Sequence, residues 1–130
     1  MLRTIKSLLE RNALFVAIVS TLAVAVLSLG AVPKINTGLN LKSGDKYLHF
    51  IAYFTLCFLW YFALRKRLHR YLFRILVPVG LILYGIILEG LQSELTSYRT
   101  ADVYDALANT AGVLGAMFLF NRLLKWYDTI

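Results

Sequence analysis

The stretch that decides the fold is residues 13–32, ALFVAIVSTLAVAVLSLGAV, which carries no charged residue. A helix of this length spans the roughly 30 Å hydrocarbon core of a bilayer. Pro33 follows directly and predicts the end of the helix, because proline cannot continue its hydrogen bonding. Arg3, Lys6 and Arg11 precede the run, as in a signal peptide, but its apolar part exceeds the about 7–15 residues usual for that signal. We therefore predict a retained transmembrane helix, with a cleaved signal peptide as the alternative.

Three more apolar runs follow along the chain. They cover residues 47–64, 75–91 and 103–120. None alternates apolar and polar residues, as the strands of a membrane barrel do. Pro78 is expected in the first turn of the third helix, where a missing N–H costs little. We predict an all-α fold, a compact bundle of four transmembrane helices.

The composition supports a membrane protein with one domain, residues 1–130. Hydrophobic residues make up 59% of the chain and charged residues 16%. Soluble domains average about half apolar and about a quarter charged residues. The single cysteine, Cys57, excludes an internal disulfide and is expected to be a small packing residue.

Basic residues are distributed unequally between the two sides of the predicted membrane. Ten lie on one side: Arg3, Lys6, Arg11, Arg65, Lys66, Arg67, Arg70, Arg74, Arg122 and Lys125. Four lie on the other: Lys34, Lys42, Lys46 and Arg99. Lys and Arg accumulate in cytoplasmic loops, so both termini are predicted to be cytoplasmic. The net charge of +7 then follows from topology, and no nucleic-acid partner is expected.

Polar residues gather at the other, outer ends of three helices. They form three stripes: Asp45, His49 and Tyr53; Glu89 and Gln92; and Asp102, Asp105 and Asn109. Within each stripe the residues are three or four positions apart, which places them on one helix face. Because polar groups facing lipid are costly, the stripes should turn toward each other or toward a water-filled pocket. Lys46 and Arg99 are close enough in sequence to supply cationic partners.

Several of these residues also have a purely structural interpretation. Arg99 could form a salt-bridged cap with Asp102 or Asp105, and Asn109 an interhelical hydrogen bond. His49 could be a satisfied histidine at a helix end. For His49 and Glu89 the functional interpretation gains weight, since an ionisable group within a span indicates a site by default.

Chemical motifs are absent from this polar set. Its oxygen and imidazole groups suit several divalent ions, but no spacing typical of metal ligands occurs, so we predict neither a metal nor a cofactor. No G-x-S-x-G nucleophile motif is present. If the protein is an enzyme, the candidate catalytic residues are His49 and Glu89, acting as general acid or base.

The fourth helix carries small residues beyond its polar stripe. Gly112, Gly115 and Ala116 allow another backbone to come close. Packing within the bundle is the main interpretation, and a homo-oligomer through these residues is the alternative.

The chain resembles the VanZ-like family of membrane proteins. The matching stretches are Asp45-Lys46-x-x-His49-x-x-x-Tyr53, Glu89-x-x-Gln92 and Arg99-x-x-Asp102-x-x-Asp105-x-x-x-Asn109-x-x-Gly112-x-x-Gly115. The founding member of this family is associated with low-level resistance to the glycopeptide antibiotic teicoplanin. The resemblance implies a compact multi-span protein of the bacterial cell envelope, but it implies no particular reaction.

These observations lead to one main functional hypothesis and two alternatives. The protein is expected to lie in the bacterial inner membrane and to bind an anionic envelope lipid or lipid-linked glycan in an outward-facing polar pocket. Lys46 and Arg99 would engage the anion. The other polar residues of the three stripes would position these cations or accept hydrogen bonds from sugar hydroxyls. The alternatives are an intramembrane enzyme acting on such a lipid or glycan, and a structural helper subunit.

Overall fold

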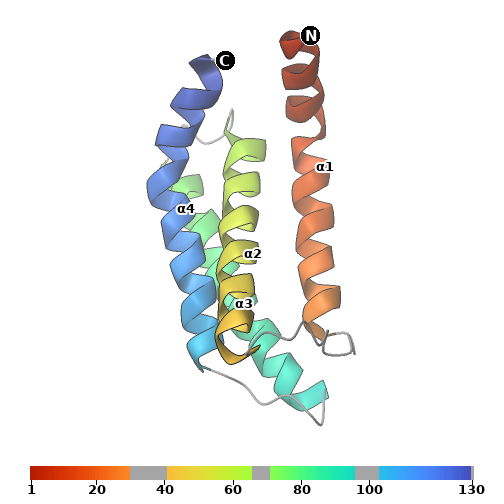
Figure 1. Ribbon diagram of the computed structural model, residues 1–130, viewed down its shortest axis with the longest axis vertical. Coiled ribbons are helices and arrows are strands. Elements are labelled where there is room, and N and C mark those ends of the chain that lie inside the picture. Colours follow the sequence, from red (N-terminus) through yellow and green to blue (C-terminus); the bar gives the residue numbers. More distant parts are fainter. Residues whose placement is uncertain (30–40, 66–70, 96–102, 130) are drawn as a thin grey trace.

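The computed structural model describes residues 1–29, 41–65, 71–95 and 103–129, which form four α-helices (Figure 1). The helices are α1 (Leu2–Leu29), α2 (Leu41–Leu64), α3 (Tyr71–Leu95) and α4 (Val103–Thr129). Each is long and apolar enough to cross a membrane, and the described residues include no strand. The predicted all-α bundle of four transmembrane helices is therefore confirmed.

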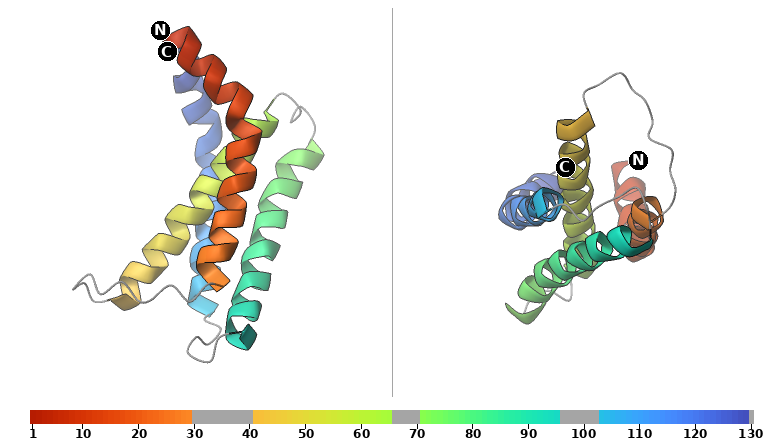
Figure 2. Two further views of the ribbon diagram at one scale, coloured as in Figure 1. Left: turned by 90° about the vertical axis from the view of Figure 1, so that its right-hand side faces the viewer. Right: turned by 90° about the horizontal axis from the view of Figure 1, so that it is seen from below.

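Both chain termini lie at the same end of the bundle. Figures 1 and 2 show the start of α1 and the end of α4 at the same end of the bundle. We call this the terminal end. The last turns of α1 and α3 and the first turns of α2 and α4 lie at the opposite end (Figure 1), which we call the distal end. Which of the two ends faces the cytoplasm stays a prediction from the charge distribution.

The helices extend beyond the predicted apolar runs. α3 begins at Tyr71, before the run that starts at Ile75, and α4 continues past Phe120 to Thr129. Long basic side chains such as that of Arg74 can reach water while the backbone stays helical. The described part of α1 ends at Leu29, so residues 30–33, including the predicted stop, lie outside the described residues.

Because α3 begins four residues before the predicted apolar run, Pro78 has a different position in the helix from the one predicted. This residue lies inside the helix, so its predicted place in the first turn is wrong. A proline lacks the N–H that would bond the carbonyl four residues earlier, here that of Arg74. Tyr61 of α2 donates its hydroxyl to this carbonyl at 2.8 Å. A neighbouring helix thus supplies the missing donor, which allows proline inside membrane helices.

The core lies between α2 and α4, the helix pair with the most extensive contact. Its buried residues include Tyr53, Leu56, Cys57, Tyr61, Val113, Ala116 and Phe120. Cys57 is buried and free, consistent with the expected packing role. Gly112 lies where the two backbones approach, because a Cβ there would overlap the carbonyl oxygen of Phe50. The small residues of α4 therefore pack against α2 within the chain.

Hydrogen bonds attach α1 to its neighbours. Trp60 of α2 donates its indole N–H to the Thr21 hydroxyl at 2.9 Å, and the Tyr84 hydroxyl of α3 donates to the Thr21 carbonyl. The buried residues of α1 are two small ones, Ala13 and Ala17. Most of the apolar surface of α1 is consequently left for lipid.

Candidate functional site

His49 connects α2 with α4 at the distal end of the bundle. Its Nδ1 lies 3.0 Å from Oδ1 of Asn109. An amide oxygen can only accept a hydrogen bond, so Nδ1 is the donor in this contact. The other ring nitrogen, Nε2, lies 3.7 Å from Oδ2 of Asp105, one helical turn before Asn109. The predicted stripe of α4 therefore meets the predicted stripe of α2.

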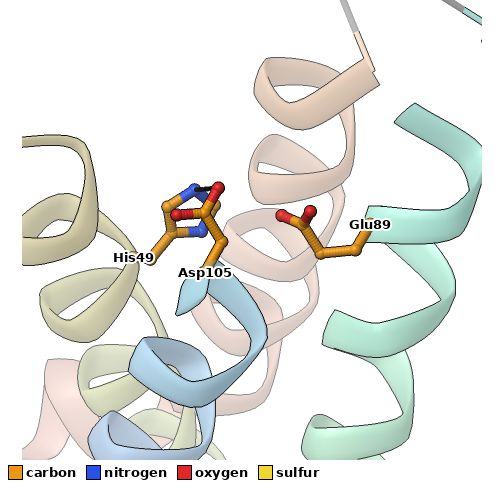
Figure 3. A group of neighbouring side chains, drawn as sticks. All are labelled: His49, Glu89 and Asp105. Carbon is orange, nitrogen blue, oxygen red and sulfur yellow. Dashed lines mark ion pairs between the residues drawn. The ribbon is translucent and has the colours of Figure 1, made fainter. Parts of the chain in front are cut away.

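Glu89 brings α3 into the same group. One ligand atom each of His49, Glu89 and Asp105 lies within 4.8 Å of the other two. Figure 3 shows the Glu89 carboxylate pointing from α3 toward the imidazole ring and the Asp105 carboxylate. Glu89 is 6% exposed and Asp105 7%. The chain thus brings two buried carboxylates and a partly buried imidazole together at one end of a membrane bundle. We call these three residues, with Asn109, the polar cluster.

Tyr53 lies beside the polar cluster, next to a glycine that the sequence analysis did not identify. A Cβ on Gly85 would come within 3.0 Å of Nδ2 of Asn109 and 3.2 Å of the Tyr53 ring. Gly85 therefore leaves room on α3 for both side chains. One signal for this residue was available, because Gly85 precedes Glu89 by four positions and so shares its helix face.

Gln92 has a different neighbour from the one expected. Its Nε2 donates to the carbonyl of Ser28 at 2.7 Å, which links α3 to the last described turn of α1. Gln92 is buried, like Glu89, and this hydrogen bond is made to α1. A glutamine at a helix crossing can satisfy a backbone carbonyl in this way.

Four of the predicted site residues cannot be placed. Arg99 and Asp102 lie outside the described residues, and the side chains of Asp45 and Lys46 are likewise not described. Asp45 and Lys46 belong to the first turns of α2, at the distal end. The structure therefore brings together His49, Tyr53, Glu89, Asp105 and Asn109 of the ten predicted residues.

The polar cluster places two carboxylates and one imidazole close together. Two carboxylates close together in a poorly solvated place repel each other, so a proton or another cation stabilises them. An imidazole beside a carboxylate can hold such a proton and transfer it. Carboxylates also accept hydrogen bonds from hydroxyl groups. The cluster is thus suited to proton transfer, hydroxyl recognition or cation binding.

A second polar region lies at the terminal end. A cavity of about 380 Å³ is lined by Tyr61, Arg65, Arg74, Met117, Phe120, Asn121 and Leu124. Arg65 forms an ion pair with Glu10 of α1, and its guanidinium lies 4.5 Å from the centre of the Phe62 ring. The sequence analysis used these arginines as topology signals and did not predict a cavity between them.

Four long apolar helices with buried polar side chains at one end define a small integral membrane protein. The VanZ/LLP1 family model matches residues 2–125 of the 130 residues, so the chain belongs to the VanZ/LLP1 family. The resemblance drawn from the motifs between Asp45 and Gly115 is confirmed and extends over nearly the whole chain. No curated protein and no solved structure matches the chain.

Proposed function

We propose that this VanZ-like membrane protein binds the headgroup of an anionic envelope lipid or lipid-linked glycan at its distal end. By the charge distribution this end faces outward from the bacterial inner membrane. The observation that carries the proposal is the convergence of His49, Glu89 and Asp105 from three helices. Buried ionisable groups destabilise a membrane bundle, and their retention is typical of a functional site.

The chemistry of the cluster suits a headgroup with several hydroxyls. The carboxylates of Glu89 and Asp105 can accept hydrogen bonds from sugar hydroxyls, as the Asn109 amide can. Lys46 lies three residues before His49, which favours the same face of α2. Lys46 would contact a phosphate as a point charge and Arg99 as a bidentate fork. Asp45 and Asp102 would hold these cations in place.

The family resemblance also suggests a role in resistance to teicoplanin, which this binding activity could provide. A protein that holds or screens a lipid-linked glycan at the outer membrane face would reduce the access of teicoplanin to the envelope. This link is drawn from the family and not from the geometry of the cluster. It is therefore tested separately, as growth in teicoplanin.

The central experiment replaces Glu89 by Gln and measures lipid binding to the purified protein by native mass spectrometry. Loss of this charge should weaken binding by about 2–5 kcal/mol, as expected when one member of a buried charge pair is removed. Arg99→Ala should weaken it similarly, and the double variant should lose less than the sum because both changes damage one interaction. Glu94→Gln is the matched control, since Glu94 is an exposed carboxylate on the same helix.

Wild-type lipid binding and wild-type teicoplanin sensitivity for Glu89→Gln would contradict the proposal. The remaining interpretation would then be a structural helper subunit, in which the His49–Asn109 hydrogen bond holds α2 to α4. In that case Asn109→Leu should lower the thermal stability in detergent without changing the set of bound lipids.

A second candidate is an intramembrane enzyme acting on the same kind of lipid. The observation that favours it is the orientation of His49, with Nδ1 donating to Asn109 and Nε2 facing Asp105. Such a pair can move a proton during hydrolysis or transfer. An enzyme would lose turnover in His49→Gln or Glu89→Gln while keeping its lipid. Loss of lipid in both variants would instead favour the binding protein.

A further inference from the structure

His49, Glu89 and Asp105 form a compact set of potential metal ligands. A tetrahedral zinc ion about 2.0–2.2 Å from each nitrogen or oxygen places its ligand atoms about 3.4 Å apart. The three atoms here lie within 4.8 Å of one another. The widest pair would therefore have to close by about 1.4 Å to bind one ion, and rotation of the long Glu89 side chain can supply such a movement.

The orientation of the imidazole supports the same conclusion independently of distance. Asn109 accepts a hydrogen bond from Nδ1, and Nε2 is the ring nitrogen that faces Asp105, at 3.7 Å. Metal-binding histidines usually donate their other ring N–H to an oxygen in this way, which fixes the ring orientation. With Nδ1 engaged by Asn109, Nε2 is the nitrogen that would bind an ion beside Asp105.

The charges of the cluster also match a divalent ion. Glu89 and Asp105 are both buried, at 6% and 7% exposure. Carboxylates held between helices are stabilised by cationic partners. A divalent cation bound by both carboxylates would be the largest local charge in the site.

We propose that His49 Nε2, Glu89 and Asp105 bind one divalent metal ion of the zinc type, which bridges the protein to a phosphate oxygen of its lipid ligand. One imidazole with two carboxylates favours zinc over magnesium, which prefers oxygen ligands and retains water. Three protein ligands leave a fourth tetrahedral position for the phosphate. The ion thus explains how a cluster with two carboxylates binds an anion. The bridging part of the proposal rests on the proposed function, whereas the metal site itself does not.

Metal binding is tested on the full-length protein in detergent after removal of metal with a chelator. Titration with Zn²⁺ should give one ion per chain and raise the melting temperature, with saturation near one equivalent. Mg²⁺ should bind at least about tenfold more weakly. Co²⁺ should give the absorption of a four-coordinate site with nitrogen and oxygen ligands. Absence of both stoichiometric Zn²⁺ and a melting shift in the wild-type protein overturns the metal site.

Variants then locate the ion. Glu89→Gln and Asp105→Asn should each lower the Zn²⁺ affinity at least about tenfold, and Asn109→Ala should do so about 10- to 100-fold by releasing the imidazole. Glu94→Gln should bind Zn²⁺ like the wild type, because Glu94 is exposed and not part of the cluster. Equal Zn²⁺ affinity in Glu89→Gln and Glu94→Gln would contradict the assigned ligands.

Lipid binding measured with and without the chelator separates this proposal from the proposed function. Loss of the lipid on chelation, with recovery on adding Zn²⁺ but not Mg²⁺, supports the bridge. Lipid that stays bound to the metal-free protein overturns the bridge and leaves the proposed function in place. Stoichiometric Zn²⁺ with no lipid in any preparation supports the metal site and contradicts the proposed function.

Discussion

The two ends of the bundle hold their ionisable side chains in different ways. At the distal end, Glu89 and Asp105 are buried between helices and face His49. At the terminal end, Arg74 is exposed at the cavity, and Arg65 pairs with the partly exposed Glu10. The distal end therefore holds two short acidic side chains between helices, whereas the terminal end holds its arginines around a cavity.

This difference shows which charges in a membrane protein are informative about function. A long arginine can bury its methylene groups and still bring its guanidinium to the headgroup region, so such charges cost little and mainly set topology. The carboxylates of Glu89 and Asp105 are held inside the cluster and meet other protein groups there. Ionisable groups held between membrane helices in this way are typical of a functional site.

The largest expected effect concerns which end of the bundle faces the cytoplasm. It is tested by cysteine labelling, in which a position either reacts or does not. In a Cys57→Ala background, cysteines at Asn40 and Thr96 should react with a membrane-impermeant thiol reagent in intact cells. A cysteine at His69 should not. Positions 40 and 96 belong to the connections at the distal end and 69 to the connection at the terminal end. Reaction at position 69 alone would reverse the orientation and place the polar cluster on the cytoplasmic side.

The next effect tests how tightly the distal half is packed. Gly112→Leu should lower the free energy of unfolding in detergent by about 3 kcal/mol, in the upper part of the range for overpacked cores, because the backbone of α2 occupies the space. Gly80→Leu is the matched control, since a Cβ there meets nothing within 4 Å. Chemical denaturation followed by tryptophan fluorescence measures both. Equal stability of the two variants would mean that α2 and α4 do not approach closely at Gly112.

A smaller effect is expected at the terminal end, where Tyr61 satisfies the Arg74 carbonyl. Tyr61→Phe should destabilise the protein by about 1–3 kcal/mol, the cost of leaving a buried acceptor without a donor. Pro78→Ala restores the backbone N–H, so Tyr61→Phe should cost less than about 1 kcal/mol in that background. A thermodynamic cycle of the four proteins measures this coupling. Strictly additive effects would show that the hydroxyl and the proline act independently.

The smallest effect concerns the ion pair between Glu10 and Arg65. Glu10→Gln should destabilise the protein by about 0.2–1 kcal/mol, as is usual for pairs near water, and the effect should shrink at high salt. Asp128→Asn serves as the control, because Asp128 is an exposed carboxylate near the end of α4. Melting temperatures at low and high salt provide the measurement. A loss of stability as large as that of Tyr61→Phe would show that the Glu10–Arg65 ion pair contributes more than a pair near water should.

The sequence predicted much of the polar cluster because helical spacing fixes which residues share a face. His49, Asp105 and Asn109 were assigned to facing stripes by this periodicity, and the structure places them in contact. Glu89 was identified because an ionisable residue in an apolar run is unusual. Periodicity does not identify the neighbour of a stripe, however. Gln92 shares its stripe with Glu89 but donates to the Ser28 carbonyl of α1, since that end of α3 also lies beside α1.

The helix ends and the proline were harder to predict. The apolar run of α3 starts at Ile75, but the helix starts at Tyr71, because the backbone stays hydrogen-bonded beyond the hydrocarbon core. This shift moved Pro78 from the first turn to the interior of the helix. Inside the helix, Pro78 leaves the Arg74 carbonyl without a helical N–H donor, and the Tyr61 hydroxyl donates to it instead. The sequence alone does not predict this contact.

The attachment of α1 depends on helices that are synthesised after it. α1 precedes α2 and α3 in the chain, and its hydrogen-bond donors Trp60, Tyr84 and Gln92 all lie in these later helices. A single helix satisfies its own backbone in lipid and can remain there alone. The side-chain hydrogen bonds that fix α1 can therefore form only after α2 and α3 have been inserted.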